Sequence, residues 1–167
     1  MIIKTCRRVF GAVSLVYLAT QLTGCVSPSG GARPSWLGPT ADDWGRQVLA
    51  VGNQMVINGA IIRGGCWDYI DAVYSRAGFP ESKRHKVFKS VKRGPYVDTS
   101  LIRPGDWLYF VNHSYNGIEH SAIFVEWVNQ GSRKARMLSY AGQNRREPAR
   151  YMNYDLSNVY TIIRPKP

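Results

Sequence analysis

The sequence predicts an α+β domain, with helices in its first half and a small antiparallel β-sheet in its second half. Two segments after residue 40 carry apolar residues at helical spacing. From Asp106 onward, aromatic and β-branched residues gather in short runs separated by turn sequences. Helices followed by a series of strands are typical of the α+β class.

The first helix is expected to begin at Thr40, which opens a sequence similar to a capping box with Asp43 in place of Glu. The pair Asn58-Gly59 indicates its end. Apolar residues recur between these limits as one stripe, formed by Trp44, Val48, Val51 and Met55. We therefore expect this helix to bury one face.

A second helix is expected from about Cys66 to Ala77, with Gly78 at its end. Its apolar face holds Ile70, Val73, Tyr74 and Ala77. In the basic segment 83–93 that follows, we expect a short helix. Its inward residues would be Val87, Phe88 and Val91.

Three consecutive antiparallel strands are expected within residues 106–113, 119–128 and 134–142. The turn sequences SYNGI and NQGSR separate them. Residues 158–165, NVYTIIRP, are expected to form the last strand. The sheet would then be built mainly from neighbouring hairpins.

Residues 1–24 have the order of an export signal: basic residues, an apolar run and small residues. The apolar run, Val9 to Thr20, is shorter than the roughly 18 residues that a membrane span needs. The run ends at Leu-Thr-Gly-Cys25, which resembles a bacterial lipobox, in which the cysteine is lipidated and becomes the first residue. Residues 25–39 are rich in Ser, Gly and Pro and are expected to form a flexible tether, followed by one domain at 40–167.

Cysteine usage leaves one candidate nucleophile. The chain has three cysteines, and cleavage at the lipobox would remove Cys6 and modify Cys25. An exported domain with only Cys66 free cannot close an internal disulfide and must rely on its core. The net charge of +11 would suggest nucleic acid in the cytoplasm, but outside it the nearer anions are cell-wall carboxylates and lipid head groups. We therefore expect no nucleic-acid partner.

Cys66 follows Gly64-Gly65 and opens the second expected helix. A helix N-terminus lowers the pKa of a thiol through its partial positive charge and its unpaired N–H groups. The alternative is a buried, inert cysteine, since free cysteines are among the most buried residues.

A cysteine nucleophile also needs a base, ordinarily histidine. His85 lies in the basic segment and His113 at a turn, whereas His120 opens a strand that would fix its direction. A histidine at a strand end can also be purely structural.

The segments GGCWDYIDAVYSRAG, IRPGDWLYFV and HSAIFVEWV, in this order, resemble the NlpC-type and CHAP-type cell-wall hydrolases. This papain-like superfamily of peptidases and amidases places a cysteine at a helix start, a Pro-Gly-Asp turn before a strand, and a histidine at the start of the next strand. The resemblance covers about residues 44–165. It implies a papain-like fold and hydrolysis of peptidoglycan stem-peptide bonds through a thioester, with Cys66 as nucleophile and His120 as base.

Two departures from the family pattern affect the site. Relatives of the NlpC type follow the cysteine with Ser-Gly, whereas this chain has Trp67-Asp68, which is nearer to the CHAP pattern. The upstream tyrosine of the NlpC branch has no counterpart in NGAIIRGG.

The third catalytic residue is expected on the strand after that of the histidine. Strand register favours Ser139 there, with Gln143 and Asn144 as alternatives. Serine can accept the imidazole N–H but stabilises imidazolium less than a carboxylate would, so we expect a slow enzyme.

Substrate contacts are expected from Trp67, Asp68, Tyr69 and Arg145, while Asp68 and Tyr69 can also be ordinary exposed helix residues. Arginine pairs with carboxylates in a two-point geometry, which favours Arg145 near the site. The tryptophans and tyrosines are expected mostly in the core, with a place in the lining of a cleft as the alternative for Trp67 and Trp107. The basic segment is either a groove for an anionic polymer or, as is more usual, a solvated surface.

No cofactor or metal is expected, because Cys66, His113 and His120 lack a fourth ligand. The expected partners are peptidoglycan and, through the lipid, the membrane, with the protein itself a monomer. In a Gram-negative cell we expect the periplasmic face of the outer membrane. The alternatives are an inactive binding lipoprotein of the same fold, or a superfamily acyltransferase or deamidase acting on another amide or on lipid.

Overall fold

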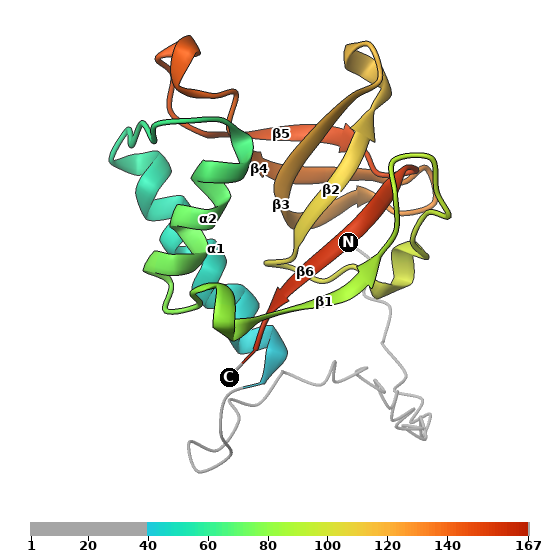
Figure 1. Cartoon of the computed structure of the whole chain (residues 1–167), viewed down its shortest axis with the longest axis horizontal. Coiled ribbons are helices and arrows are strands. Elements are labelled where there is room, and N and C mark those ends of the chain that lie inside the picture. Colours follow the sequence, from blue (N-terminus) through green and yellow to red (C-terminus); the bar gives the residue numbers. More distant parts are fainter. Residues whose placement is uncertain (1–39, 167) are drawn as a thin grey trace, which may run out of the picture. The chain divides into compact units, whose positions relative to one another are not determined.

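Two helices cover one face of a six-stranded antiparallel sheet (Figure 1). The computed structural model describes residues 40–166. The helices are α1 (Ala41–Ile57) and α2 (Cys66–Arg76), with short 3-10 turns η1 (Glu81–Lys83), η2 (Thr99–Leu101), η3 (His113–Tyr115) and η4 (Gln143–Arg145). The strands are β1 (Arg84–Lys89), β2 (Trp107–Asn112), β3 (Ile118–Asn129), β4 (Lys134–Ser139), β5 (Arg150–Asp155) and β6 (Val159–Pro165). The α+β class predicted from the sequence is confirmed. The predicted lipidation site, Cys25, and the tether 25–39 lie outside the described residues.

The sheet has the order β1-β6-β2-β3-β4-β5, and all its pairs are antiparallel. The predicted meander is present as β2, β3 and β4, and the chain continues it with β5, which the sequence analysis did not predict. The predicted last strand, β6, returns between β1 and β2. The strand β3, which carries His120, is therefore paired on both sides and held rigidly.

The predicted start and stop signals of α1 are confirmed. The backbone N–H and the hydroxyl of Thr40 donate to the Asp43 carboxylate at 2.8 and 2.6 Å, and the Asp43 N–H donates to Thr40 Oγ1. This arrangement satisfies N–H groups that the first helical turn leaves without partners. The helix ends at Asn58, and Gly59 adopts a positive φ of 62°. Val48 and Met55 are buried as predicted, and Trp44 and Val51 pack half-buried beside them.

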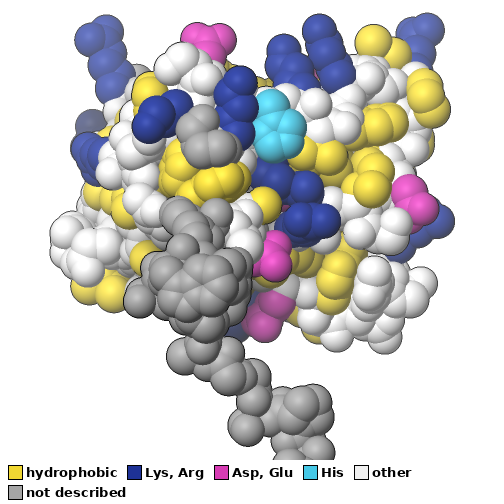
Figure 2. Space-filling view, turned by 90° about the horizontal axis from the view of Figure 1, so that it is seen from below, with side chains coloured by type: hydrophobic (Ala, Val, Ile, Leu, Met, Phe, Trp, Pro, Cys, Tyr) yellow, Lys and Arg dark blue, Asp and Glu magenta, His cyan; other side chains and the backbone are white. Residues whose placement is uncertain are grey.

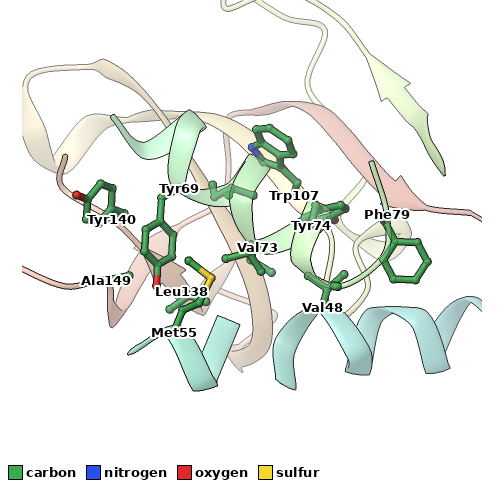
Figure 3. Packing of buried hydrophobic residues seen from close by; sticks show 13 residues of the cluster. Val48, Met55, Tyr69, Val73, Tyr74, Phe79, Trp107, Leu138, Tyr140 and Ala149 are labelled. Carbon is green, nitrogen blue, oxygen red and sulfur yellow. The ribbon is translucent and has the colours of Figure 1, made fainter. Parts of the chain in front are cut away.

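The core between the helices and the sheet is largely aromatic (Figure 3). Tyr74 donates a hydrogen bond of 2.6 Å to the carbonyl of Gly105, so this large ring is buried without an unsatisfied hydroxyl. Trp107 packs against it at a centroid distance of 5.7 Å. The buried members of this core are Val48, Met55, Tyr69, Ile70, Val73, Tyr74, Ala77, Phe79, Trp107, Ile123, Leu138, Tyr140 and Ala149. Burial on this scale fixes α2, and with it Cys66, against the sheet.

The other face of the sheet has a second core. It contains Leu108, Phe110, Ala122, Phe124 and Met137, which alternate along their strands with residues of the first core. The segment between β1 and β2 adds Val97 and Ile102. Both faces of the central strands are therefore apolar.

The predicted short helix in the basic segment is wrong. The chain makes one 3-10 turn at Glu81–Lys83 and then the edge strand β1, which pairs with β6. A register shift between Lys86 and Phe88 lets both Val87 and Phe88 pack half-buried on the second core, whereas Val91 is 64% exposed. A bulged strand has lost the alternation that identifies strands from sequence. Its exposed lysines are typical of edge strands, where charge prevents pairing between molecules.

The Pro-Gly-Asp turn before β2 is held by a buried ion pair. Both carboxylate oxygens of Asp106 accept from the Arg164 guanidinium, at 2.7 and 2.8 Å, and Asp106 is 1% exposed. The Arg164 Nη2 also donates to the carbonyl of Leu101 at 2.7 Å. Gly105 passes so close to Gly45 of α1 that a Cβ at Gly45 would lie 2.1 Å from the Pro104 oxygen. This contact sets the distance between α1 and the start of β2.

We expect Arg164→Met to lower the free energy of unfolding by about 3–5 kcal/mol, because it leaves the buried Asp106 carboxylate without its charged partner. Urea denaturation followed by circular dichroism measures this change. The matched control is Arg136→Met, which removes an exposed pair with Glu126 and should cost at most about 1 kcal/mol. Equal effects of the two substitutions would contradict the structural role of the buried pair.

Candidate active site

Cys66 is the first residue of α2 and follows a sharp corner at Gly64 and Gly65. Gly64 has a φ of 108°, and a Cβ there would lie 2.1 Å from Oδ2 of Asp68. That same oxygen accepts a hydrogen bond of 2.7 Å from the Gly65 N–H. Asp68 therefore caps the helix that carries the thiol, and the glycine at 64 leaves room for it. The N–H of Cys66, at the first helical position, has no partner within the helix.

Gln143 holds this corner from the other side of the site. The Gly64 N–H donates to Oε1 of Gln143 at 3.0 Å, and the Gln143 N–H donates to the Gly64 carbonyl at 2.9 Å. Gln143 begins the 3-10 turn η4, just after β4. The start of α2 is thereby fixed to the exit of β4, although the two residues are far apart in the sequence. The sequence analysis gave Gln143 as an alternative partner for His120, but its side chain accepts a hydrogen bond from Gly64 instead.

His120 lies against Ser139, the partner favoured by strand register. Its Nε2 is 2.8 Å from the Ser139 hydroxyl, which is in turn 2.8 Å from the hydroxyl of Tyr154 on β5. Ser139 is 5% exposed, so its two hydrogen bonds are largely shielded from water. Three strands, β3, β4 and β5, therefore supply one hydrogen-bonded chain that ends at the imidazole.

Aromatic rings also restrict the His120 ring. Phe110, its partner across β2 and β3, meets it edge-on at a centroid distance of 5.6 Å. Tyr154 lies 5.5 Å away. Because the Ser139 hydroxyl occupies Nε2, the other ring nitrogen, Nδ1, is left for proton exchange with a nucleophile.

The thiol of Cys66 has a lowered pKa. Burial raises the pKa of this half-buried group, but interactions with the side chains of His120 and Ser121 together lower it to about 7. The thiol and the imidazole are thus near neighbours. Since the thiolate is the reactive form, a substantial fraction of Cys66 is nucleophilic at neutral pH.

A groove of about 640 Å³ contains Cys66, His120 and Ser139 in its lining, and we call it the catalytic groove. Arg145 lines it, as expected from the sequence, together with Arg150 and Glu147, which are paired at 3.2 Å. Exposed apolar side chains also line it: Tyr115, Ile118 and Met152. The groove can hold a ligand with both apolar and anionic parts.

The other predicted substrate residues lie apart from this groove. Tyr69 is 1% exposed and stacks on Tyr140 in the core, so its expected contact with substrate is not possible without unfolding. Asp68 serves the helix cap described above. Trp67 is 49% exposed and lines a separate cleft together with Trp107, which is 1% exposed and belongs to the core as expected for most of the tryptophans.

The remaining polar candidates do not form a metal site. His85 on β1 and His113 in η3 are exposed, and within residues 40–166 no three His, Cys, Asp or Glu side chains are grouped to hold a metal ion. On the face shown in Figure 2, Lys and Arg side chains are scattered among apolar and uncharged ones.

Sequence reasoning missed two residues beside the candidate site, Ser121 and Tyr154. Ser121 follows His120, and period-two alternation alone would have placed it on the helix side of the sheet, near Cys66. Tyr154 lies on β5, the strand that was not predicted, so no signal in the sequence linked it to Ser139.

Alkylation of Cys66 by iodoacetamide should accelerate as the pH rises through about 7, where the thiol loses its proton. In His120→Ala the imidazole no longer opposes the effect of burial, which raises the pKa of the thiol. We therefore expect the midpoint of the alkylation profile to move to higher pH. Mass spectrometry of the folded chain lacking residues 1–25, in which Cys66 is the one remaining thiol, measures both profiles. A midpoint near 9 in the unsubstituted protein would contradict an activated thiol.

Comparisons of the chain with protein-family models, with curated proteins and with solved structures found no match. In the part of the chain that the structure describes, no helix is both long and apolar enough to cross a membrane.

Proposed function

We propose that this protein is a papain-like cysteine hydrolase that cleaves peptide or amide bonds in peptidoglycan stem peptides. The observation that carries the proposal is that Cys66, at a helix N-terminus, and His120 line the same groove, where the imidazole lowers the pKa of the thiol. The second ring nitrogen of His120 is held by Ser139, as a base in such a pair requires.

In the proposed mechanism His120 takes the proton of Cys66, and the thiolate attacks the carbonyl carbon of the scissile amide. The negative charge on the carbonyl oxygen is stabilised by the Cys66 N–H and the partial positive charge of the α2 N-terminus. His120 then gives its proton to the departing amine, which leaves a thioester on Cys66. A water molecule, deprotonated by His120, hydrolyses the thioester and restores the thiol.

The peptidoglycan substrate is proposed from two features. The ordered motifs around Cys66, Pro104-Gly105-Asp106 and His120 resemble those of cell-wall hydrolases. Arg145 in the catalytic groove suits the carboxylates of stem peptides, because guanidinium binds a carboxylate at two points. An anchor at Cys25 would keep the domain at a membrane facing the cell wall.

The apolar side chains of the catalytic groove favour a second candidate function, transfer or hydrolysis of an acyl group from a lipid. Tyr115 and Ile118 are 57% and 49% exposed beside Glu119, where a peptide substrate would gain little from them. An acyl chain would bury this apolar area. The same Cys66 thioester chemistry would serve either substrate.

Purified sacculi incubated with the protein should release soluble peptide fragments, identified by mass spectrometry. In Cys66→Ala and in His120→Ala we expect release to fall by on the order of 10³-fold, because the nucleophile and its base act as a unit. Fragments that are identical in the Cys66→Ala sample would contradict the proposed hydrolase. Release of fatty acid from phospholipid vesicles, without fragments from sacculi, would favour the acyl alternative.

Ser139→Ala should lower kcat/KM about tenfold, because one neutral hydrogen bond to the base contributes about 0.5–1.5 kcal/mol. Tyr154→Phe removes only the outer hydroxyl of the chain and should have a smaller effect. The pH profile of kcat/KM distinguishes a positioning role from general destabilisation. Loss of Ser139 should move the profile along the pH axis as well as lower its maximum, whereas general destabilisation should only lower the maximum. An unchanged profile and unchanged rate in Ser139→Ala would exclude Ser139 from the site.

A further inference from the structure

A second cleft of about 510 Å³ lies beside the start of α2. We call it the aromatic cleft, because its lining includes the rings of Trp67, Trp107 and Tyr109. Trp67 directly follows Cys66 in the sequence. Tyr109 pairs with Ser121 across β2 and β3, and Ser121 contacts the thiol. Cys66 lines the catalytic groove and Trp67 lines this cleft, so two adjacent residues border the two sites.

The three rings form a connected row. Trp67 and Trp107 lie 5.6 Å apart between centroids, and Trp107 and Tyr109 are stacked at 5.6 Å with an interplanar angle of 16°. Trp107 is 1% exposed, whereas Trp67 is 49% exposed. The Trp67 ring thus packs against the buried Trp107 ring and is exposed to solvent on its other side. A ring of this size is more usually buried.

The ionisable side chains of the cleft carry both signs of charge. Asp71 and Glu81 lie there with Arg84 and Lys86. Arg84 is already engaged, since its Nη1 donates to Asp71 at 2.6 Å and its Nε donates to the Phe79 carbonyl at 2.7 Å. A strongly anionic ligand finds little free positive charge here. An acyl chain would strip water from several charged groups without giving them hydrogen bonds.

We propose that the aromatic cleft binds a pyranose ring, so that the substrate is a peptide still attached to a glycan strand. A pyranose has one face of C–H groups, which can stack on the Trp67 ring, and a rim of hydroxyl groups. The hydroxyls can donate to the carboxylates of Asp71 and Glu81 and accept from Lys86. This inference rests on the proposed hydrolase function and specifies its substrate. The sugar would lie on one side of Cys66, and the peptide carboxylates on the other, near Arg145.

Binding of sugar can be tested without catalysis. We expect a β-1,4-linked trimer of N-acetylglucosamine to bind the full chain, purified in detergent, as measured by isothermal titration calorimetry. Trp67→Ala should weaken binding about five- to tenfold, and Trp67→Phe should restore most of it because a flat ring remains. The control Val128→Ala removes a side chain that is 53% exposed on β3 and should leave the affinity unchanged. No heat of binding in the unsubstituted protein, or equal affinity in Trp67→Ala, would overturn the proposal.

Kinetics separate the sugar site from the hydrolase itself. We expect a disaccharide-linked peptide to have a kcat/KM at least about tenfold higher than the same peptide without sugar. In Trp67→Ala this ratio should fall toward one, and Val128→Ala should keep it. Equal turnover of both substrates by the unsubstituted protein overturns the sugar site but leaves the hydrolase. Absence of turnover together with retained trimer binding overturns the hydrolase but leaves the sugar site.

Discussion

The site depends on the two hydrogen bonds between Gly64 and Gln143. They tie the corner before α2 to the turn after β4, so the thiol of Cys66 cannot move independently of the strand that carries Ser139. The same short stretch, from Ser139 to Gln143, thus holds the imidazole at one end and the nucleophile's helix at the other. A nucleophile and a base from distant parts of the chain need such a common support, because small displacements break proton transfer.

The core explains why this support is rigid. The β3 strand is paired on both sides, and its residues alternate between two apolar cores, one under the helices and one on the opposite face. The buried ion pair of Asp106 and Arg164 joins the turn before β2 to β6. These two strands are therefore connected by side chains as well as by backbone hydrogen bonds. The catalytic groove and the aromatic cleft are bordered by adjacent residues of α2, Cys66 and Trp67 respectively.

The sequence predicted the elements whose signals are local. Thr40 and Asp43 marked the start of α1, Gly78 marked the end of α2, and the aromatic and β-branched residues of β3 placed His120 near the start of a strand. Ser139 followed from register, because its strand neighbours that of His120. What failed were features decided by distant contacts. The bulge at Val87 removes the alternation that would have identified β1 as a strand. Strand β5 lacks a clear alternation, so neither it nor Tyr154 was predicted. The direction of the Tyr69 side chain into the core depends on its stacking with Tyr140. The role of Gln143 could not be read from the sequence, because its partner, Gly64, is 79 residues away.

The neutral partner of His120 has a consequence for the thiol. A carboxylate would stabilise the imidazolium and so favour the thiolate–imidazolium pair. Ser139 and Tyr154 offer only hydroxyl dipoles to His120. Burial of Cys66 opposes its ionisation, whereas the interaction with His120 favours it, and the pKa of the thiol is lowered to about 7. The thiolate fraction, on which the proposed chemistry depends, would therefore fall on mild acidification without any change of structure.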